Sequence, residues 1–278
     1  MLDRICVVTG ATDGIGRQTA LGLAKLGARV VIVGRNDDKG RKVSRELTQA
    51  SGNEHVCHET ADLSRAADIR SLAARLCDAL PRIDRLVNNA GGYFAGYAKT
   101  DEGLEYTFAL NHLSYALLTD LLLDRLKAAD EARIVNVASG VHRGVSLDLD
   151  DPQFEAGYDG WLAYRRSKLM NVMYTYALAR RLEGTGVTTN VLHPGFVRSR
   201  FGHNNPGLRG WGMRLGQRLA AISLEAGAAT SLHVATDPAL AGISGRYFER
   251  SRETASSPQS HDMAAQERLW QLTHNMLD

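Results

Sequence analysis

Short apolar runs alternate along the chain with longer segments in which apolar positions recur every three or four residues. The short runs predict six strands, at 4–10, 28–34, 54–60, 83–91, 132–139 and 187–195. The longer segments predict helices at 14–27, 37–51, 65–80, 101–127 and 161–184. Several runs are almost continuously apolar, which is typical of parallel strands covered on both faces. The alternation therefore predicts an α/β fold, with a doubly wound parallel sheet between two layers of helices.

No linker, internal repeat or low-complexity tract divides the 278 residues, so we expect one domain, 1–278. Apolar residues make up 44% of the chain and charged residues 23%, which is ordinary for a soluble globular protein. The formal net charge of +2 gives no argument for a nucleic-acid partner.

The three cysteines, Cys6, Cys57 and Cys77, match neither a disulfide framework nor a metal site, and they fit a reducing compartment. The N-terminus carries only the short apolar run 5–8, unlike a signal peptide. No run approaches the roughly 18 to 20 apolar residues that span a bilayer. We therefore expect a cytoplasmic protein without a transmembrane segment.

Three glycines, Gly10, Gly14 and Gly16, lie between the first predicted strand and the first predicted helix. Glycines at such a turn let backbone N–H groups approach a pyrophosphate, which then lies at the positive end of the helix. The spacing differs from the common GxGxxG pattern, and turns also use glycine where no ligand binds. The strand before and the helix after favour a dinucleotide-binding turn.

The second predicted strand ends Gly34-Arg35-Asn36, where such folds place the adenosine ribose. An acidic side chain there favours NAD, whereas arginine is a planar, multidentate donor for a 2′-phosphate. Gly34 leaves room for that phosphate, and we expect Asp37 and Asp38 to cap the following helix. A solvated surface charge is the alternative interpretation of Arg35. NADP is favoured over NAD.

Tyr164 and Lys168 are four residues apart in a predicted helix, which places both side chains on one face. A phenol has an ordinary pKa of about 10, and a nearby ammonium favours the phenolate and lowers that pKa. Such a pair is suited to proton transfer near neutral pH. Taken alone, a Tyr-x-x-x-Lys pair also occurs by chance on surface helices.

Ser139 and Asn111 are further candidates for chemistry. Ser139 follows a predicted strand, at the carboxyl end where parallel sheets bind ligands, and its hydroxyl can donate a hydrogen bond to a substrate oxygen. Asn111 is polar among apolar helical positions, which requires a local reason. A helix kink or a hydrogen-bonded buried amide is the alternative interpretation of Asn111.

Together these residues resemble the classical short-chain dehydrogenase/reductase family, over nearly the whole chain. The glycine motif matches residues 9–16, Asn-Asn-Ala-Gly is at 88–91, and Pro-Gly is at 194–195. The family's adenine-ring motif looks like Asp62-Leu63, and all motifs follow the family's order and approximate spacing. The resemblance implies a single Rossmann-type NAD(P)-binding domain with a substrate lid around 196–222.

The resemblance also implies a role for each catalytic candidate. Tyr164 would be the general acid/base, and Ser139 would hold and polarise the carbonyl oxygen. Lys168 would bind the nicotinamide ribose and lower the tyrosine pKa, and Asn111 would hold a water for proton relay. With those named above, the expected cofactor contacts are Gly10, Thr12, Asp13, Gly14, Ile15, Gly16, Arg35, Asn36, Asp62, Leu63, Asn88, Ala90, Gly91, Tyr164, Lys168, Pro194, Gly195, Val197 and Ser199.

More narrowly, the chain looks like the retinol-dehydrogenase-like branch, through LNHL at 110–113, ARIVNVAS at 132–139 and LHPG at 192–195. Many NADP-preferring relatives carry a basic residue before the second glycine, where this chain has Asp13. The apolar anchor of the branch's membrane-bound members is absent, and the serine motif reads Ala138-Ser139-Gly140. By resemblance, a homo-oligomer would pack the helices near 101–127 and 161–184.

The segment 198–218 is basic and contains no acidic residue; its arginines are Arg198, Arg200, Arg209, Arg214 and Arg218. Apolar side chains are interleaved with them, namely Phe201, Trp211, Met213, Leu215 and Leu219. Three interpretations stay open: a lid over an apolar substrate or an acidic carrier, shallow attachment to an anionic membrane surface, or a solvated basic face. The acidic residues within 148–159 are expected to form a capped, solvated loop rather than a metal site.

The leading function is an NADP(H)-dependent oxidoreductase that transfers hydride between nicotinamide and a carbonyl or alcohol group of an apolar or amphipathic small molecule. A nucleotide-binding regulatory protein on the same fold is the alternative, although it has no chemical need for the catalytic residues. The glycine spacing and the short C-terminal part argue against a nucleotide-sugar epimerase. His112 and His193 are expected to be packed or hydrogen-bonded, and Tyr93 and His142 to border the substrate by position alone.

Overall fold

The structure is a computed structural model, and it describes residues 1–197 and 222–277. Its sheet has the strand order β3-β2-β1-β4-β5-β6-β7-β8, in which β8 alone pairs antiparallel. The strands are β1 Ile5–Thr9, β2 Arg29–Gly34, β3 Val56–Thr60, β4 Arg85–Asn88, β5 Ala132–Val137, β6 Val187–His193, β7 Tyr247–Glu249 and β8 Arg252–Glu253. All six predicted strands are therefore confirmed, together with their parallel pairing.

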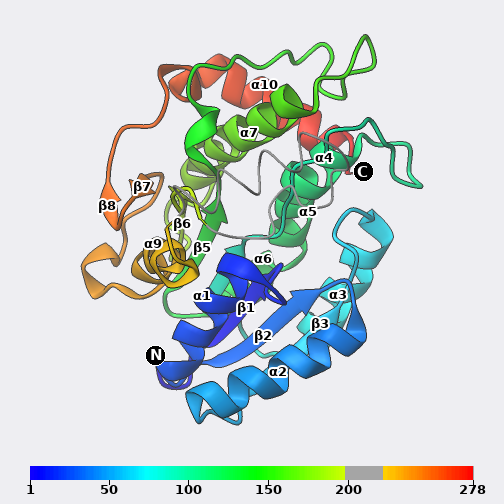
Figure 1. Cartoon of the computed structure of the whole chain (residues 1–278). Helices are drawn as coiled ribbons and strands as arrows, with labels where there is room; N and C mark the ends of the chain where they lie inside the picture. Colours follow the sequence, from blue (N-terminus) through cyan, green and yellow to red (C-terminus); the bar gives the residue numbers. More distant parts are fainter. Residues whose placement is uncertain (198–221, 278) are drawn as a thin grey trace.

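Helices cover both faces of this sheet (Figure 1). One layer consists of α1 Gly14–Lys25, α2 Asp37–Ser51 and α9 Leu224–Thr236. The other consists of α3 Ala66–Ala79, α5 Ser114–Leu121 and α7 Gly160–Arg181, with α10 Met263–Asn275 packed on α7. Shorter elements are α4 Tyr106–Phe108, the π-helical turn η1 Ala109–Leu113, α6 Leu123–Lys127, and the 3-10 turns η2 Gly140–His142, η3 Pro238–Leu240 and η4 Pro258–His261. The predicted doubly wound architecture is confirmed.

The apolar runs are continuous because each central strand is buried on both sides. Successive side chains of a strand point to opposite faces. In β1, Cys6 and Val8 pack with α1, α2 and α9, whereas Val7 packs with α3, α5 and α7. Every residue of β1 is buried. The glycine turn follows β1 directly, at the carboxyl edge of the sheet.

The predicted helix at 101–127 was wrong at its start and in its continuity. Gly103 has φ +80°, which is left-handed backbone, and helical structure begins only at Tyr106. The Glu105 carboxylate caps this start by accepting from the N–H groups of Thr107 and Phe108, at 2.8 and 2.7 Å. The helix then passes through the π-helical turn η1 before α5.

Within the described ranges, no helix has the length and apolar character that crossing a membrane requires.

Candidate active site

The four predicted catalytic residues lie at the carboxyl ends of the central strands. Ser139 is two residues beyond β5, and its side chain is near enough to the phenol of Tyr164 on α7 to favour the ionised form of that phenol. Lys168 lies one helical turn further and donates to the Val137 carbonyl over 3.1 Å. Its Nζ is 5.9 Å from the centroid of the Tyr164 ring. Asn111 lies on the adjacent turn η1, which packs against α7.

Asn111 is held at a local break in the helix. Its Oδ1 accepts from the N–H of Gly92 over 2.9 Å, and its Nδ2 donates to the Gly92 carbonyl and to Ser167 Oγ, at 2.9 and 3.0 Å. The main-chain carbonyl of Asn111 accepts from Asn171 Nδ2 over 2.8 Å. The hydrogen-bonded buried amide is confirmed, and Asn111 lies in the π-helical turn η1. π-helical turns of this kind are frequent at functional sites.

Burial sets the protonation of the tyrosine–lysine pair. Burial raises the pKa of Tyr164 to about 12, although the hydrogen bond with Ser139 opposes this shift. Burial lowers the pKa of Lys168 from 10.5 to about 7. In the protein without bound cofactor, desolvation of the phenol therefore dominates the pKa of Tyr164, and a lowering by Lys168 stays a prediction. At pH 7 the Tyr164 phenol carries its proton and can donate it.

Two further aromatic side chains surround Tyr164. Tyr93 lies edge-on to the Tyr164 ring, with ring centroids 6.3 Å apart. Trp161 stacks on the Tyr164 ring at 5.8 Å and 25°, and the Tyr93 and Trp161 rings meet edge-on at 5.8 Å, so the three rings form one cluster. Tyr93 is buried, whereas Trp161 is 39% exposed. Trp161 was not among the sequence candidates, because an aromatic residue three positions before Tyr164 is consistent with simple helix packing.

His142 does not border a substrate, and that expectation was wrong. Its side chain is fully buried, with Nδ1 2.6 Å from the Ser139 carbonyl oxygen. Its Nε2 accepts from the N–H of Ser257 over 3.1 Å, so Nδ1 carries the proton and donates to Ser139. His112 is also buried and hydrogen-bonded, as predicted. His142 thus fixes the backbone of the serine turn.

The glycine turn and the segment after β4 are joined tightly. Thr9 Oγ1 accepts from the N–H groups of Asn89 and Ala90, at 2.9 and 3.0 Å, and Asn89 Nδ2 donates to the Thr9 carbonyl over 2.8 Å. Gly10 has φ +62°, and an added Cβ there would lie 2.8 Å from Ala90 Cα. An added Cβ at Gly16 would lie 2.6 Å from the Gly10 carbonyl oxygen. Only glycines fit this turn at the N-terminus of α1, and it has the form that accepts a pyrophosphate.

The end of β2 differs in one respect from the expectation. Asn36 caps α2 by accepting from the N–H of Lys39 over 2.8 Å, so Asp37 and Asp38 lie in the first turn and do not cap it. The Asp37 carboxylate is hydrogen-bonded to His58, Arg41 and Thr60, and these bonds lower its pKa to about 2. Asp37 therefore faces β3. The capping position was mistaken because Asn and Asp are equally good caps.

The remaining predicted cofactor residues occupy several different environments. Arg35 is exposed, with Nη1 3.5 Å from the hydroxyl of Tyr106. The Asp62 carboxylate accepts from the N–H and hydroxyl of Ser64, at 3.0 and 2.7 Å. Asn88 is fully buried and donates to side chains inside the fold, so its own side chain belongs to the core.

Gly91 has a position that excludes any side chain. An added Cβ would lie 2.9 Å from Asn111 Oδ1 and 3.4 Å from Lys168 Nζ. After β6, Gly195 has φ +90°, and Val197 is buried. Ser199 and the arginines within 198–218 lie outside the described residues, as does most of the expected lid.

A family model described as short chain dehydrogenase matches residues 4–206, which is more than half of the chain. The chain belongs to the short-chain dehydrogenase family. Human retinol dehydrogenase 12 is 40% identical over 275 residues, covering 99% of this chain and 86% of that protein. This similarity confirms the retinol-dehydrogenase-like branch. As a short-chain dehydrogenase of this branch, the protein is an oxidoreductase that uses a nicotinamide cofactor on alcohol or carbonyl groups.

Solved structures agree with this assignment. A crystal structure of an uncharacterised protein from Mycobacterium paratuberculosis has a TM-score of 0.80 and 28% identity, covering 99% of this chain and 94% of that one. A short chain dehydrogenase from Shigella flexneri, complexed with NADP, has a TM-score of 0.69 and 25% identity, covering 91% and 98%.

The acidic segment before α7 in this short-chain dehydrogenase has the capped form that was predicted. Asp148 Oδ1 accepts from the N–H groups of Asp150 and Asp151, each at 3.2 Å, and Asp159 caps the first turn of α7. Asp150 is ion-paired with Arg268 on α10. Across the two described ranges, no cluster of His, Cys, Asp and Glu is arranged to hold a metal ion.

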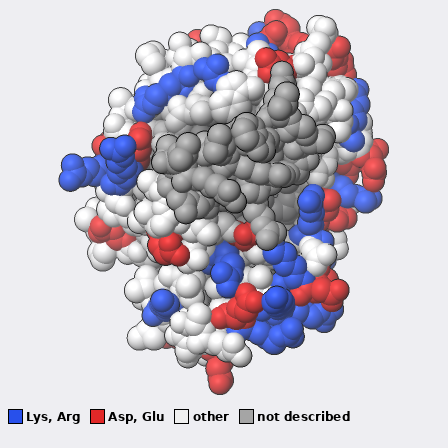
Figure 2. Space-filling model, in the orientation of Figure 1, with Lys and Arg blue, Asp and Glu red and all other residues white. Residues whose placement is uncertain are grey.

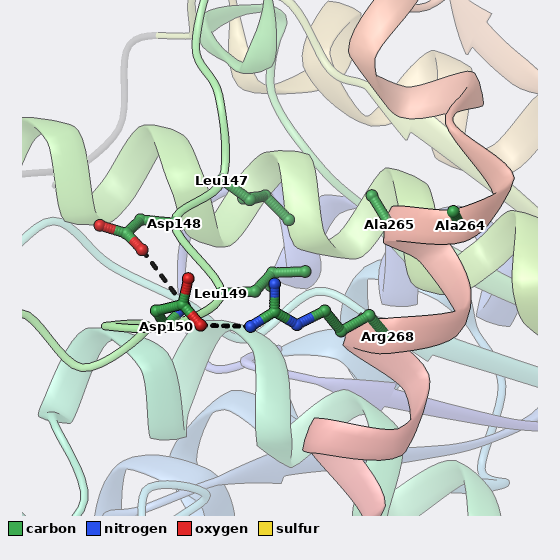
Figure 3. Close-up of a pocket in the computed structure, with 7 residues that line it drawn as sticks. All are labelled: Leu147, Asp148, Leu149, Asp150, Ala264, Ala265 and Arg268. Carbon is green, nitrogen blue, oxygen red and sulfur yellow. Dashed lines mark hydrogen bonds and ion pairs between the residues drawn. The ribbon is translucent and has the colours of Figure 1, made fainter.

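A hollow of about 580 Å³ lies between this loop and α10 (Figure 3). It is lined by Leu147, Asp148, Leu149, Asp150, Ala264, Ala265 and Arg268. The two leucines point toward α10, and the ion pair crosses the hollow (Figure 3). None of the predicted catalytic or cofactor residues lines it, so it is separate from the active site.

The two buried histidines predict a loss of stability in mild acid. Burial lowers the pKa of His112 and of His142 to about 4. Below pH 6.5 the unfolded chain takes up protons that the folded chain resists, so the free energy of unfolding falls as pH drops toward 4. The loss should reach on the order of 3 kcal/mol for each histidine.

Thermal unfolding at pH 7 and pH 4.5 measures this effect. A His142→Gln variant should be less stable than wild type at pH 7 but show a smaller decrease on acidification. The matched control is His55→Gln, because His55 is exposed, and its pH dependence should be that of wild type. Equal pH dependence in all three proteins would contradict the assignment to His142.

Proposed function

We propose that this protein is an NADP(H)-dependent oxidoreductase whose substrate is an apolar or amphipathic small molecule with a carbonyl or alcohol group. The observation that carries the proposal is the grouping of Ser139 and Tyr164 beside the buried Lys168, whose Nζ is 5.9 Å from the centroid of the Tyr164 ring. A nucleotide-binding regulatory protein has no chemical use for this arrangement. The proposed domain is the whole chain, 1–278, with a lid around 196–222. The free cysteines support a cytoplasmic location. The resemblance to the family supports a homo-oligomer.

Each of the four catalytic residues has a separate role in the reaction. Bound nicotinamide supplies or accepts the hydride. In the direction of reduction, the Ser139 hydroxyl donates a hydrogen bond to the carbonyl oxygen, and the protonated phenol of Tyr164 gives its proton to that oxygen. Lys168 provides positive charge beside the tyrosinate that forms, and Asn111 holds the water through which the proton is replaced.

Exposed apolar side chains, one of them beside Tyr164, support an apolar substrate. The exposed part of Trp161 lies against the Tyr164 ring. Phe196 and Ile222, one on each side of the segment that is not described, are 47% and 41% exposed and are joined by a hydrogen bond of 2.8 Å. Retinol dehydrogenase 12, by its name, acts on an apolar alcohol, so retinal and retinol belong among the first substrates to test.

Turnover of purified protein with NADPH and NADH, on retinal and a panel of aldehydes, ketones and quinones, tests the proposal. We expect kcat/KM to be at least about tenfold higher with NADPH, a difference of about 1.4 kcal/mol. Arg35→Leu should remove most of this preference, while Arg45→Leu, an exposed change on α2, should preserve it. Equal rates with both cofactors would refute the NADP preference and leave the reaction class unchanged.

A further inference from the structure

An ion pair connects the glycine turn with the first turn of α2. Asp13 precedes Gly14, and its Oδ1 accepts from the N–H of Gly14 over 2.8 Å. Its Oδ2 accepts from Lys39 Nζ over 2.9 Å. Lys39 lies in α2, and α1 and α2 both begin at the carboxyl edge of the sheet (Figure 1). The ammonium of Lys39 therefore reaches from α2 across to the turn that precedes α1.

The space that Lys39 crosses adjoins the end of β2. An added Cβ at Gly34 would lie 2.5 Å from Cγ2 of Thr12, so the glycine turn and the end of β2 are in contact at this point. Thr12 is followed by Asp13, and Gly34 by Arg35. This is the place where a doubly wound sheet receives the adenosine ribose and, in NADP, its 2′-phosphate. Lys39 and Arg35 are thus two cations on the border of the same space.

Lys39 keeps N–H donors for an anion although its ammonium is paired with Asp13. Figure 2 shows basic and acidic side chains intermingled on the part of the surface where α2 and α3 lie in Figure 1. The ion pair that each basic side chain forms therefore has to be considered separately. Arg17 and Lys42 are paired with Glu46, and Arg41 with Asp37. Lys39 is paired with Asp13 at the edge of the ribose space, and an ammonium has three N–H donors.

The ion pair itself contributes little to folding. The side chains of Lys39 and Asp13 are 39% and 45% exposed. Pairs this accessible to water contribute about 0 to 1 kcal/mol to stability. Without Lys39, however, the Asp13 carboxylate would lose this positive charge, and its repulsion of an incoming phosphate would increase. The consequence of the pair is therefore expected in ligand binding.

We propose that Lys39 is a specificity-determining residue that contacts the 2′-phosphate together with Arg35 and neutralises the repulsion between Asp13 and that phosphate. The inference rests on the proposed preference for NADP. It resolves the apparent conflict between an acidic residue in the glycine turn and an arginine after β2. The cation beside Asp13 comes from α2, 26 residues further along the chain.

The test uses adenosine 2′,5′-bisphosphate and 5′-AMP as probes, because they differ by the 2′-phosphate and need no turnover. Titration calorimetry on the full chain should show that Lys39→Met weakens binding of the bisphosphate about tenfold and that of 5′-AMP less than about twofold. Lys42→Met is the matched control, with the same change of charge one turn along α2, and it should change neither affinity more than about twofold.

A double variant distinguishes a direct contact between Lys39 and the 2′-phosphate from repulsion of that phosphate by Asp13. Asp13→Asn keeps the helix cap, since asparagine and aspartate cap equally well. Added to Lys39→Met, it should restore part of the lost affinity for the bisphosphate, by about threefold. A Lys39→Met protein that still discriminates between the probes as wild type does would overturn the inference, while the NADP proposal would stand. A wild type that does not discriminate would overturn both.

Discussion

Replacing Tyr164 with phenylalanine is expected to lower kcat/KM for carbonyl reduction by about 10³-fold, within the range typical for loss of a general acid. The phenol is the group beside Ser139 that holds a proton at pH 7, because burial raises its pKa to about 12. Phenylalanine keeps the ring that packs against Tyr93 and Trp161. The variant should therefore bind cofactor with the affinity of wild type, and the loss should lie in kcat.

Steady-state kinetics with and without the substitution, with bound cofactor followed by fluorescence, measures this effect. Tyr176→Phe is the control, since Tyr176 lies on the same helix and its hydroxyl is hydrogen-bonded to Ser256 over 2.7 Å, in the C-terminal part of the chain. It should change kcat/KM by less than about threefold. A Tyr164→Phe enzyme with more than about a tenth of wild-type activity would show that another group delivers the proton.

The parallel strands could be predicted because burial on both faces leaves a plain sequence signal. Val7 and Val8 pack on opposite layers of helices, so neither position of β1 can be polar. The elements that were missed have no such signal. β7 and β8 contain three and two residues, too few for any period to be detected. Helix α9 packs against α1 through small residues, so it has only a weak apolar stripe.

The catalytic candidates could be predicted because proton transfer needs particular residue types at local spacing, such as Tyr164 and Lys168 at i and i+4. The pKa values of these residues could not be predicted, because desolvation depends on side chains that folding brings in from other parts of the chain. The same limit applies to His142, whose partners are the Ser139 carbonyl and the distant N–H of Ser257. Sequence reasoning thus found the chemical groups, and the three-dimensional packing determined their protonation.

We expect the replacement of Lys168 by methionine to raise the stability of the protein and to lower its activity. Burial lowers the pKa of this lysine to about 7, so at pH 7 about half of the folded molecules lack the proton that the unfolded chain keeps up to a pH of about 10.4. This group therefore lowers the free energy of unfolding at pH 7, and the penalty disappears as pH rises through 10.4. Lys168→Met removes the penalty and loses the hydrogen bond to the Val137 carbonyl, which costs about 1 kcal/mol. We expect a net gain on the order of 1 kcal/mol at pH 7, or about 2–4 °C in Tm.

The same variant should lose activity by about 10²-fold or more, because the tyrosinate formed during reduction then lacks a cation beside it. Thermal unfolding at pH 7 and pH 10, together with kcat, separates the two effects: Tm should exceed that of wild type at pH 7 and fall to or below it at pH 10. Lys127→Met is the matched control, since Lys127 is exposed at the end of α6, and it should change neither Tm nor kcat appreciably. A Lys168→Met protein that is less stable than wild type at pH 7 would mean that the surroundings of Lys168 stabilise its charged form instead of penalising it.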